Sequence, residues 1–205
     1  MKGISVLVTM LLITAMVISF IVMAYLWGLP LLQKSMDRAK YDSSLEKLKD
    51  IKRGIESTVK VGSESVDFTL DSGDVLMVYY DGSLGKTVVD LKVKVGSQLI
   101  PSRWVPVAGF FELPYHPEDP KKEVVGTYGM DTYGIIIGKN FGDRVELKLV
   151  LRSLIDEYGR YYAINLTCIY PCTAGSPGKH TIHFKKAGES INLTHTIINI
   201  QCWVE

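Results

Sequence analysis

Charged residues are missing from a long stretch near the start of this 205-residue chain, because none occurs from Gly3 through Gln33. The chain as a whole has no excess of either charge: 23 basic residues stand against 22 acidic ones, and the net charge is +1. A near-neutral chain lacks the basic surface of a nucleic-acid binder, so we expect no nucleic-acid partner. The long charge-free run also argues against a soluble cytoplasmic enzyme.

Motifs for catalysis or metal binding are incomplete. The segment 82–87, Gly-Ser-Leu-Gly-Lys-Thr, has part of a phosphate-binding loop, but the full pattern needs glycine where Tyr80 stands and a helix afterwards. A zinc-like series consists of Cys168, Cys172, His180 and His183. Its spacer is short, and an offset of three in a strand puts the two histidines on opposite faces. No serine has the G-x-S-x-G setting. We therefore expect no enzymatic activity, no cofactor and no metal.

An apolar run without charge occupies residues 4–32. As a helix it would be about 44 Å long, which exceeds the roughly 30 Å of a hydrocarbon core. Tyr25 and Trp27 near its far end suit the headgroup layer. Gly28 and Pro30 follow, and we expect the helix to bend or loosen there. The run is too long for a cleaved secretory signal and predicts a transmembrane helix.

The first residues of the chain carry a further signal. Lys2 and Gly3 stand directly before the apolar run, which opens with Ile4-Ser-Val-Leu-Val-Thr-Met. This arrangement resembles the class III signal peptide of archaeal type IV pilin-like proteins. The resemblance implies that a prepilin peptidase removes a leader, residues 1–3, by cutting after Gly3. The helix would then lie in membrane lipid and later pack in a filament core against copies of itself or other pilin-like subunits. The fifth mature residue would be Val8, where bacterial pilins carry a glutamate that archaeal ones often lack.

A second helical segment is predicted over residues 33–62. Its apolar residues recur at spacings of three and four, which makes one stripe on a helix with charged residues opposite. Residues 42–44, Asp-Ser-Ser, suit the cap of a fresh helix start after a break, and Gly62 suits a helix stop. We expect this linking helix to lay its stripe on the domain that follows. The stripe consists of Tyr41, Leu45, Leu48, Ile51, Ile55 and Val59.

From residue 63 to residue 205 the apolar period changes to two, the repeat of a β-strand. Gly, Asp and Pro turns separate the strands, so the expected fold class is α+β: a long apolar helix continuing into an amphipathic helix, then an antiparallel β-sandwich-like domain. Residues 101–133 hold five prolines and are expected to form a lid over the domain or, alternatively, a contact loop. The predicted strands cover 66–70, 75–80, 87–95, 145–151, 161–169, 179–184 and 190–204.

The C-terminal region carries two sequons and three cysteines. Asn165 and Asn192 each begin an N-x-[ST] pattern and are candidate glycosylation sites, which fits an exported domain. Cys168, Cys172 and Cys202 allow one disulfide and one leftover thiol, with three pairings open. Cys168–Cys172 would close only a small loop. We slightly favour a bond from Cys168 or Cys172 to Cys202, which would tie the last strand to a neighbour.

Two observations conflict over the side of the membrane on which the domain lies. Lys34, Arg38 and Lys40 follow the span, and the positive-inside rule would then place the domain in the cytoplasm. The sequons, the expected disulfide and the resemblance favour an extracellular domain, which we expect. The expected function is a structural subunit of an archaeal type IV pilus-like surface filament, with the β domain exposed for adhesion or partner contact. The alternative is a single-span membrane-anchored envelope protein, a pilus or archaellum accessory that contacts surface-layer protein.

Overall fold

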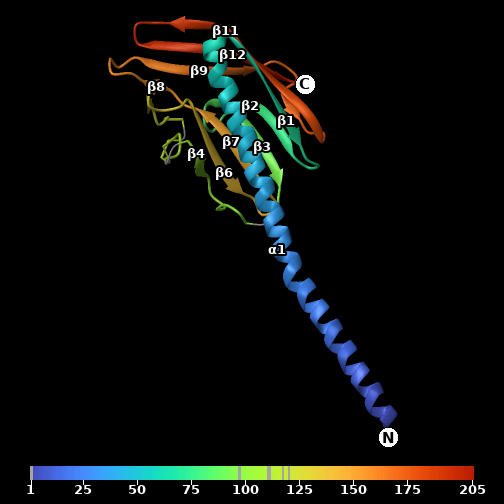
Figure 1. Ribbon diagram of the computed structural model, residues 1–205. Helices are drawn as coiled ribbons and strands as arrows, with labels where there is room; N and C mark the ends of the chain where they lie inside the picture. Colours follow the sequence, from blue (N-terminus) through green and yellow to red (C-terminus); the bar gives the residue numbers. More distant parts are fainter. Residues whose placement is uncertain (1, 97, 110–111, 117, 120) are drawn as a thin grey trace.

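The computed structural model describes residues 2–96, 98–109, 112–116, 118–119 and 121–205, with side chains described from Val8 onward. One long helix is followed by two β-sheets (Figure 1). The C-terminal part of this helix, from Tyr41 to Val61, lies along the sheets, and we call it the upper half. The part before Gln33 projects away from the sheets toward the N-terminus, and we call it the lower half (Figure 1). The predicted α+β, sandwich-like fold class is confirmed.

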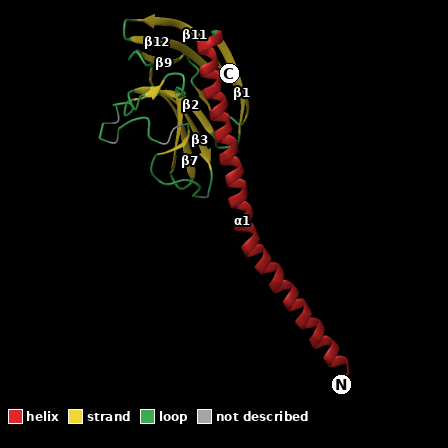
Figure 2. Cartoon of the chain, turned by 60° about the vertical axis from the view of Figure 1, so that its left-hand side comes forward, coloured by secondary structure: helices red, strands yellow, loops and turns green. Residues whose placement is uncertain are grey.

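Helix α1 runs without interruption from Lys2 to Val61 and joins the two predicted helical segments. Pro30 lies inside α1, and Figure 2 shows the helix bend below the β domain, as expected for an internal proline. Residues 42–44 do not cap a new helix, because they lie inside α1 and the Ser44 hydroxyl donates to the Lys40 carbonyl at 2.8 Å. The helix ends at Val61, and Gly62 follows it as the predicted stop, with φ at +94°.

In the part of the chain that the structure describes, twelve strands form two six-stranded sheets, with the orders β1-β11-β12-β9-β8-β5 and β10-β2-β3-β7-β6-β4. Neighbouring strands within the described residues pair antiparallel except at β12–β9 and β5–β8, which are parallel. The strands are β1 (Ser63–Leu70), β2 (Val75–Asp81), β3 (Lys86–Lys94), β4 (Val105–Ala108), β5 (Gly126–Thr127), β6 (Gly134–Asn140), β7 (Arg144–Leu151), β8 (Leu154–Ile155), β9 (Tyr161–Cys168), β10 (Thr173–Ala174), β11 (Gly178–Ile191) and β12 (His195–Val204).

The structure differs from the predicted strands in one division and in five additional strands, β4, β5, β6, β8 and β10, of which all but β6 are four residues or shorter. The predicted strand over 190–204 comprises the end of β11, a turn at 192–194 and all of β12. Strand β6 was not predicted, because its run Ile135 to Ile137 is apolar on both faces and shows no alternation. Ile136 packs in the main core, while Ile135 and Ile137 pack in a second cluster on the other side of the sheet.

The amphipathic stripe of α1 packs on the sheets as predicted. Leu48, Ile51 and Ile55 are fully buried in a core that also takes side chains from both sheets. Gly54 allows the close approach of helix and sheet, because a Cβ atom there would lie 2.5 Å from a methyl carbon of Val66. The upper half of α1 is therefore an integral part of the β domain.

Only part of the proline-rich segment 101–133 forms the expected lid, because β4 joins the second sheet and β5 joins the first. Other described residues of the segment cover one face of the second sheet. Trp104, Leu113 and Tyr115 from this segment pack on the second apolar cluster of the sheet. An ion pair between Lys86 and Glu123 fastens the lid to β3.

Candidate assembly site: the apolar half of the N-terminal helix

The lower half of α1 exposes apolar side chains on every side. All residues from Val8 to Trp27 are exposed, and the exposed fraction of the large apolar side chains ranges from 50% at Val22 to 76% at Trp27. The helix is long and apolar enough to cross a membrane. A continuous apolar surface of this size marks an interaction with lipid or with another protein.

Two polar side chains of the lower half donate hydrogen bonds to the backbone of the helix itself. The Thr14 hydroxyl donates to the Met10 carbonyl at 2.7 Å, and the Ser19 hydroxyl donates to the Ala15 carbonyl at 2.8 Å. Such back-bonding lets these two hydroxyls be surrounded by apolar groups without losing their hydrogen bonds. The Tyr25 hydroxyl lies nearer the far end of the run, where the headgroup layer is expected.

Two polar contacts hold α1 against the domain where the lower half begins. The Asp37 carboxylate accepts the Gly96 backbone N–H at 3.1 Å. One turn further along, the Lys40 ammonium pairs with Asp74 at 2.8 Å, and the same carboxylate oxygen accepts the Lys94 backbone N–H at 3.1 Å. The Asp74 side chain is 1% exposed, so its ion pair with Lys40 is largely buried between the helix and the sheet. We call this ion pair the border lock.

The predicted processing site lies at the start of α1. Lys2, Gly3 and Ile4 have helical backbone, and their side chains fall outside the described residues, as does Met1 of the predicted leader. Cleavage after Gly3 therefore stays a prediction.

The two sequons lie in different settings. Asn192 is exposed in the turn between β11 and β12, where its backbone N–H donates to the His195 carbonyl at 2.8 Å. Asn165 is exposed within β9, and its amide donates to the Asn199 side-chain oxygen at 3.0 Å. Both side chains are accessible to solvent, and glycosylation of either stays a prediction.

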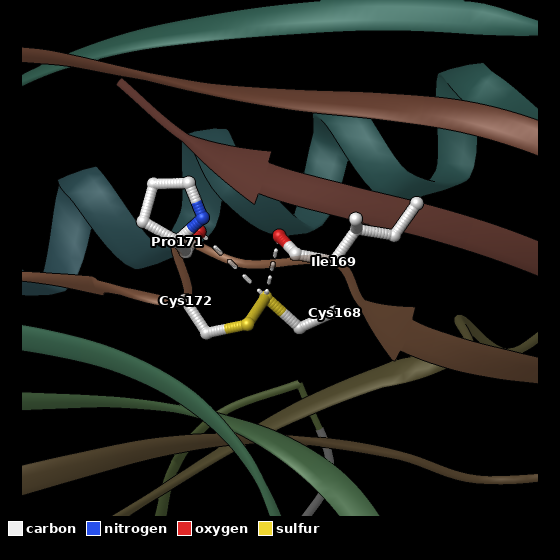
Figure 3. Close-up of a disulfide and its surroundings, with 4 residues drawn as sticks. All are labelled: Cys168, Ile169, Pro171 and Cys172. Carbon is white, nitrogen blue, oxygen red and sulfur yellow. Dashed lines mark hydrogen bonds between the residues drawn. A yellow bond between two sulfur atoms is a disulfide. The ribbon is translucent and has the colours of Figure 1, made fainter.

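The favoured disulfide pairing is wrong. Cys168 bonds to Cys172, with their Cα atoms 5.8 Å apart, and the tight loop between them contains Ile169 and Pro171 (Figure 3). Cys202 is free and fully buried, and burial raises the pKa of its thiol to about 12. Cys202 lies directly opposite Cys168 in the β9–β12 register. Cys168 therefore has both Cys172 and Cys202 as neighbours in the fold, and the sequence alone could not decide between a bond to Cys172 and a bond to Cys202.

The zinc-like series does not converge. His180 stacks on Phe68 with ring centroids 5.7 Å apart, whereas His183 stacks on Trp203 at 5.1 Å. Within the described ranges, no group of three or more His, Cys, Asp or Glu side chains is placed to hold a metal ion. The two remaining histidines lie elsewhere: His116 beside Glu118, and His195 on Tyr161.

A serine–histidine–carboxylate row that the sequence analysis missed crosses the outer face of the first sheet. The Ser65 hydroxyl lies 2.8 Å from His183 Nδ1, and His183 Nε2 lies 3.4 Å from the Glu205 carboxylate. These residues come from β1, β11 and the end of the chain, so no local motif connects them. A hydrolase also needs a turn that presents the serine to an oxyanion site, whereas Ser65 lies within an extended strand. We interpret the row as a link between neighbouring strands.

Buried charges are found mainly around the second sheet. Burial lowers the pKa of Lys86, which holds the lid, to about 8. Burial and, secondly, the nearby Glu146 carboxylate raise the pKa of Asp90 to about 6. Lys86 and its partner Glu123 line a hollow together with Arg152, whereas Asp90 does not line it.

The lower half of α1 thus exposes a long continuous run of apolar side chains, which makes it the candidate surface for contact with lipid or another protein. The β domain buries its own core and the stripe of the upper half. No protein-family model, curated protein or solved structure matches this chain.

Proposed function

We propose that this chain is a structural subunit of an archaeal type IV pilus-like surface filament. In this proposal α1 anchors the subunit in the membrane and then packs in the filament core, while the extracellular β domain is exposed for adhesion or partner contact. One observation carries the anchoring in this proposal: α1 is exposed and apolar from Val8 to Trp27, yet continues without a break into a half that is packed on the β domain. The choice of a filament subunit rests on the resemblance of Lys2 and Gly3 to a class III signal peptide.

The same helix surface suits lipid and a filament core, because neither contains water. A helix satisfies its own backbone hydrogen bonds, so it can enter either environment. Each large apolar side chain that becomes fully buried contributes ~1.5–3 kcal/mol relative to exposure in water. Burial of the lower half against neighbouring subunits would therefore offset the loss of lipid contacts when the subunit leaves the membrane.

The alternative is a single-span anchored envelope protein, and the exposed helix supports it equally. Such an accessory would stay in the membrane and present its β domain to surface-layer protein. The two candidates differ in processing: a filament subunit is cut after Gly3 by a prepilin peptidase and released, whereas an anchored accessory keeps its first residues.

Substitution at the processing site tests the proposal. Gly3→Val should block cleavage, leave the chain starting at Met1, and remove it from the surface material released by shearing. The matched control is Gly28→Val in the same half of α1, where a Cβ atom would meet nothing within 4 Å. The control should be processed and released like the parent protein. If Gly3→Val reaches the sheared fraction in parental amounts, the filament proposal is wrong.

A further inference from the structure

One end of the β domain lies beside the point where α1 leaves it. The ends of β3 and β6 point toward the lower half of the helix (Figure 1). The loop after β3 touches α1 directly, since the Gly96 N–H binds Asp37 and a shared hollow is lined by Pro30, Gln33 and Gly96. We define the membrane-facing pole as the described residues of 94–104, which exclude residue 97, together with residues 139–144. The two segments are joined by a hydrogen bond from the Asn140 N–H to the Pro101 carbonyl at 3.0 Å.

The membrane-facing pole concentrates positive charge. Its two segments carry four cations and one carboxylate, whereas the chain from Tyr41 onward has a net charge of −2. Two further cations, Lys34 and Arg38, line a hollow with Gln98 and Leu99 of the pole. The Asp42 carboxylate lines the same hollow, and Asp37 binds the Gly96 N–H, so the net positive charge comes mainly from the pole itself. The cations of the pole itself are Lys94, Arg103, Lys139 and Arg144.

Aromatic rings lie among these cations. The Lys139 ammonium is 4.6 Å from the ring centre of Phe141 and 5.9 Å from that of Trp104. The Arg144 guanidinium is 5.5 Å from the Phe141 ring, which remains 43% exposed. Aromatic rings with long basic side chains are typical of the headgroup layer, where the rings meet the apolar boundary and the cations reach phosphate.

The distance from the pole to the expected headgroup layer is short enough for an electrostatic interaction. Tyr25 and Trp27 are placed to sit in the headgroup layer, and Asp37, which binds the pole, is about 15 Å further along the helix. Lysine and arginine side chains extend toward the membrane and bring their charges closer to the headgroups. The remaining distance is about a Debye length, roughly 8–10 Å at physiological salt, over which charges still attract each other. Anionic headgroups would therefore attract the pole of an anchored subunit.

We propose that the membrane-facing pole binds anionic lipid headgroups and so holds the β domain against the membrane before assembly. This inference rests on the proposed membrane anchoring of α1. It also gives a role to Lys34 and Arg38, which follow the span on the side that the positive-inside rule disfavours.

Hydrogen exchange of the full chain in lipid nanodiscs tests this inference. Peptides covering 98–104 and 140–144 are compared between phosphatidylcholine discs and discs that also contain phosphatidylglycerol, at about 0.05 M and about 0.5 M salt. The test variant is Arg103→Gln/Arg144→Gln, and Arg103→Lys/Arg144→Lys is its charge-conserving counterpart. The matched control is Arg160→Gln/Lys185→Gln, two exposed cations outside the pole. Lys185 lies opposite Ser63, just beyond the C-terminal end of α1, and Arg160 directly precedes β9.

The pole peptides should exchange more slowly in anionic discs, and high salt should remove this difference. The double glutamine variant should lose the protection, by roughly fivefold for each cation removed, while the lysine variant and the control outside the pole keep it. Equal exchange in the two kinds of disc, with the chain inserted, would overturn the inference and leave the anchoring proposal standing. Failure of the chain to insert would contradict the anchoring itself, and the lipid-binding pole with it.

Discussion

Helix α1 passes through two environments. Between Tyr41 and Val61 it packs on the sheets along one stripe, with Leu48 and Ile51 fully buried. Between Val8 and Trp27 it is exposed all round and apolar all round. The backbone is helical in both halves, so the difference lies in the distribution of side chains.

This comparison shows how one helix can serve two surroundings. A stripe of apolar residues specifies one packed face and leaves a solvated one, whereas apolar residues on every side demand a surrounding without water. The Lys40–Asp74 pair and the Asp37–Gly96 contact mark the border between the two halves. The position of the β domain relative to the apolar half is fixed at that border.

Isoleucine truncation should produce the largest contrast between the halves. Ile51→Ala should lower the free energy of unfolding of the β domain by about 2–5 kcal/mol, because it leaves a cavity in the core. Ile13→Ala, the same change at a side chain that is 58% exposed, should change it by less than about 0.5 kcal/mol. Denaturant unfolding of both variants in the same detergent measures the difference, and equal losses would contradict the assignment of the halves.

A charge in the apolar half should instead affect anchoring. Ile13→Asp places a carboxylate near the middle of the span, which costs about 2.5–3.5 kcal/mol of insertion free energy. We expect the variant to be extracted more readily from membranes by alkaline carbonate, while its β domain unfolds at the parental denaturant concentration. Retention equal to that of Ile13→Ala would show that the lower half is not surrounded by lipid.

Loss of the border lock should have a smaller effect. Asp74→Ala leaves the Lys94 N–H and the partly buried Lys40 ammonium without their acceptor, at a cost of about 1–3 kcal/mol of domain stability. Asp71→Ala changes an exposed aspartate of the same turn and should be nearly neutral. Hydrogen exchange of residues 37–41 should increase in the first variant alone; an equal increase in both would argue against a lock at Asp74.

Glycine substitution gives the smallest and most local contrast. Gly54→Ala forces a Cβ atom against Val66, which costs about 1–3 kcal/mol by overpacking and is partly offset by about 1 kcal/mol of helix propensity. Gly28→Ala meets no atom within 4 Å and should leave domain stability unchanged. Thermal unfolding of the two variants compares them, and a stabilised Gly54→Ala would show that helix and sheet are less closely packed there.

Much of this fold could be predicted because the patterns that encode it are local. The spacing of Leu48, Ile51 and Ile55 identifies the packed face of the helix, and alternation identifies strands such as β1 and β7. Strand β6 could not be predicted from alternation, because the second sheet is covered on both sides, by the main core and by the lid. Its residues therefore have no polar face.

Non-local features of the candidate sites could not be predicted in the same way. Cys202 and Cys168 are neighbours only through the parallel pairing of β12 with β9, which no sequence spacing reveals. Ser65 and His183 are 118 residues apart in the chain and meet through the pairing of β1 with β11. The apolar half of α1 was visible from composition alone, because it needs no tertiary contact within the chain to be recognised.

The intact mass and N-terminal sequence of the native protein, taken from membranes and from sheared surface material, test the central claim most directly. The account predicts that the surface fraction contains a chain that starts at Ile4, with the Cys168–Cys172 disulfide formed and added mass on Asn165 or Asn192. A chain that starts at Met1, carries no added mass and occurs in membranes alone would contradict it, and would leave a single-span anchored protein.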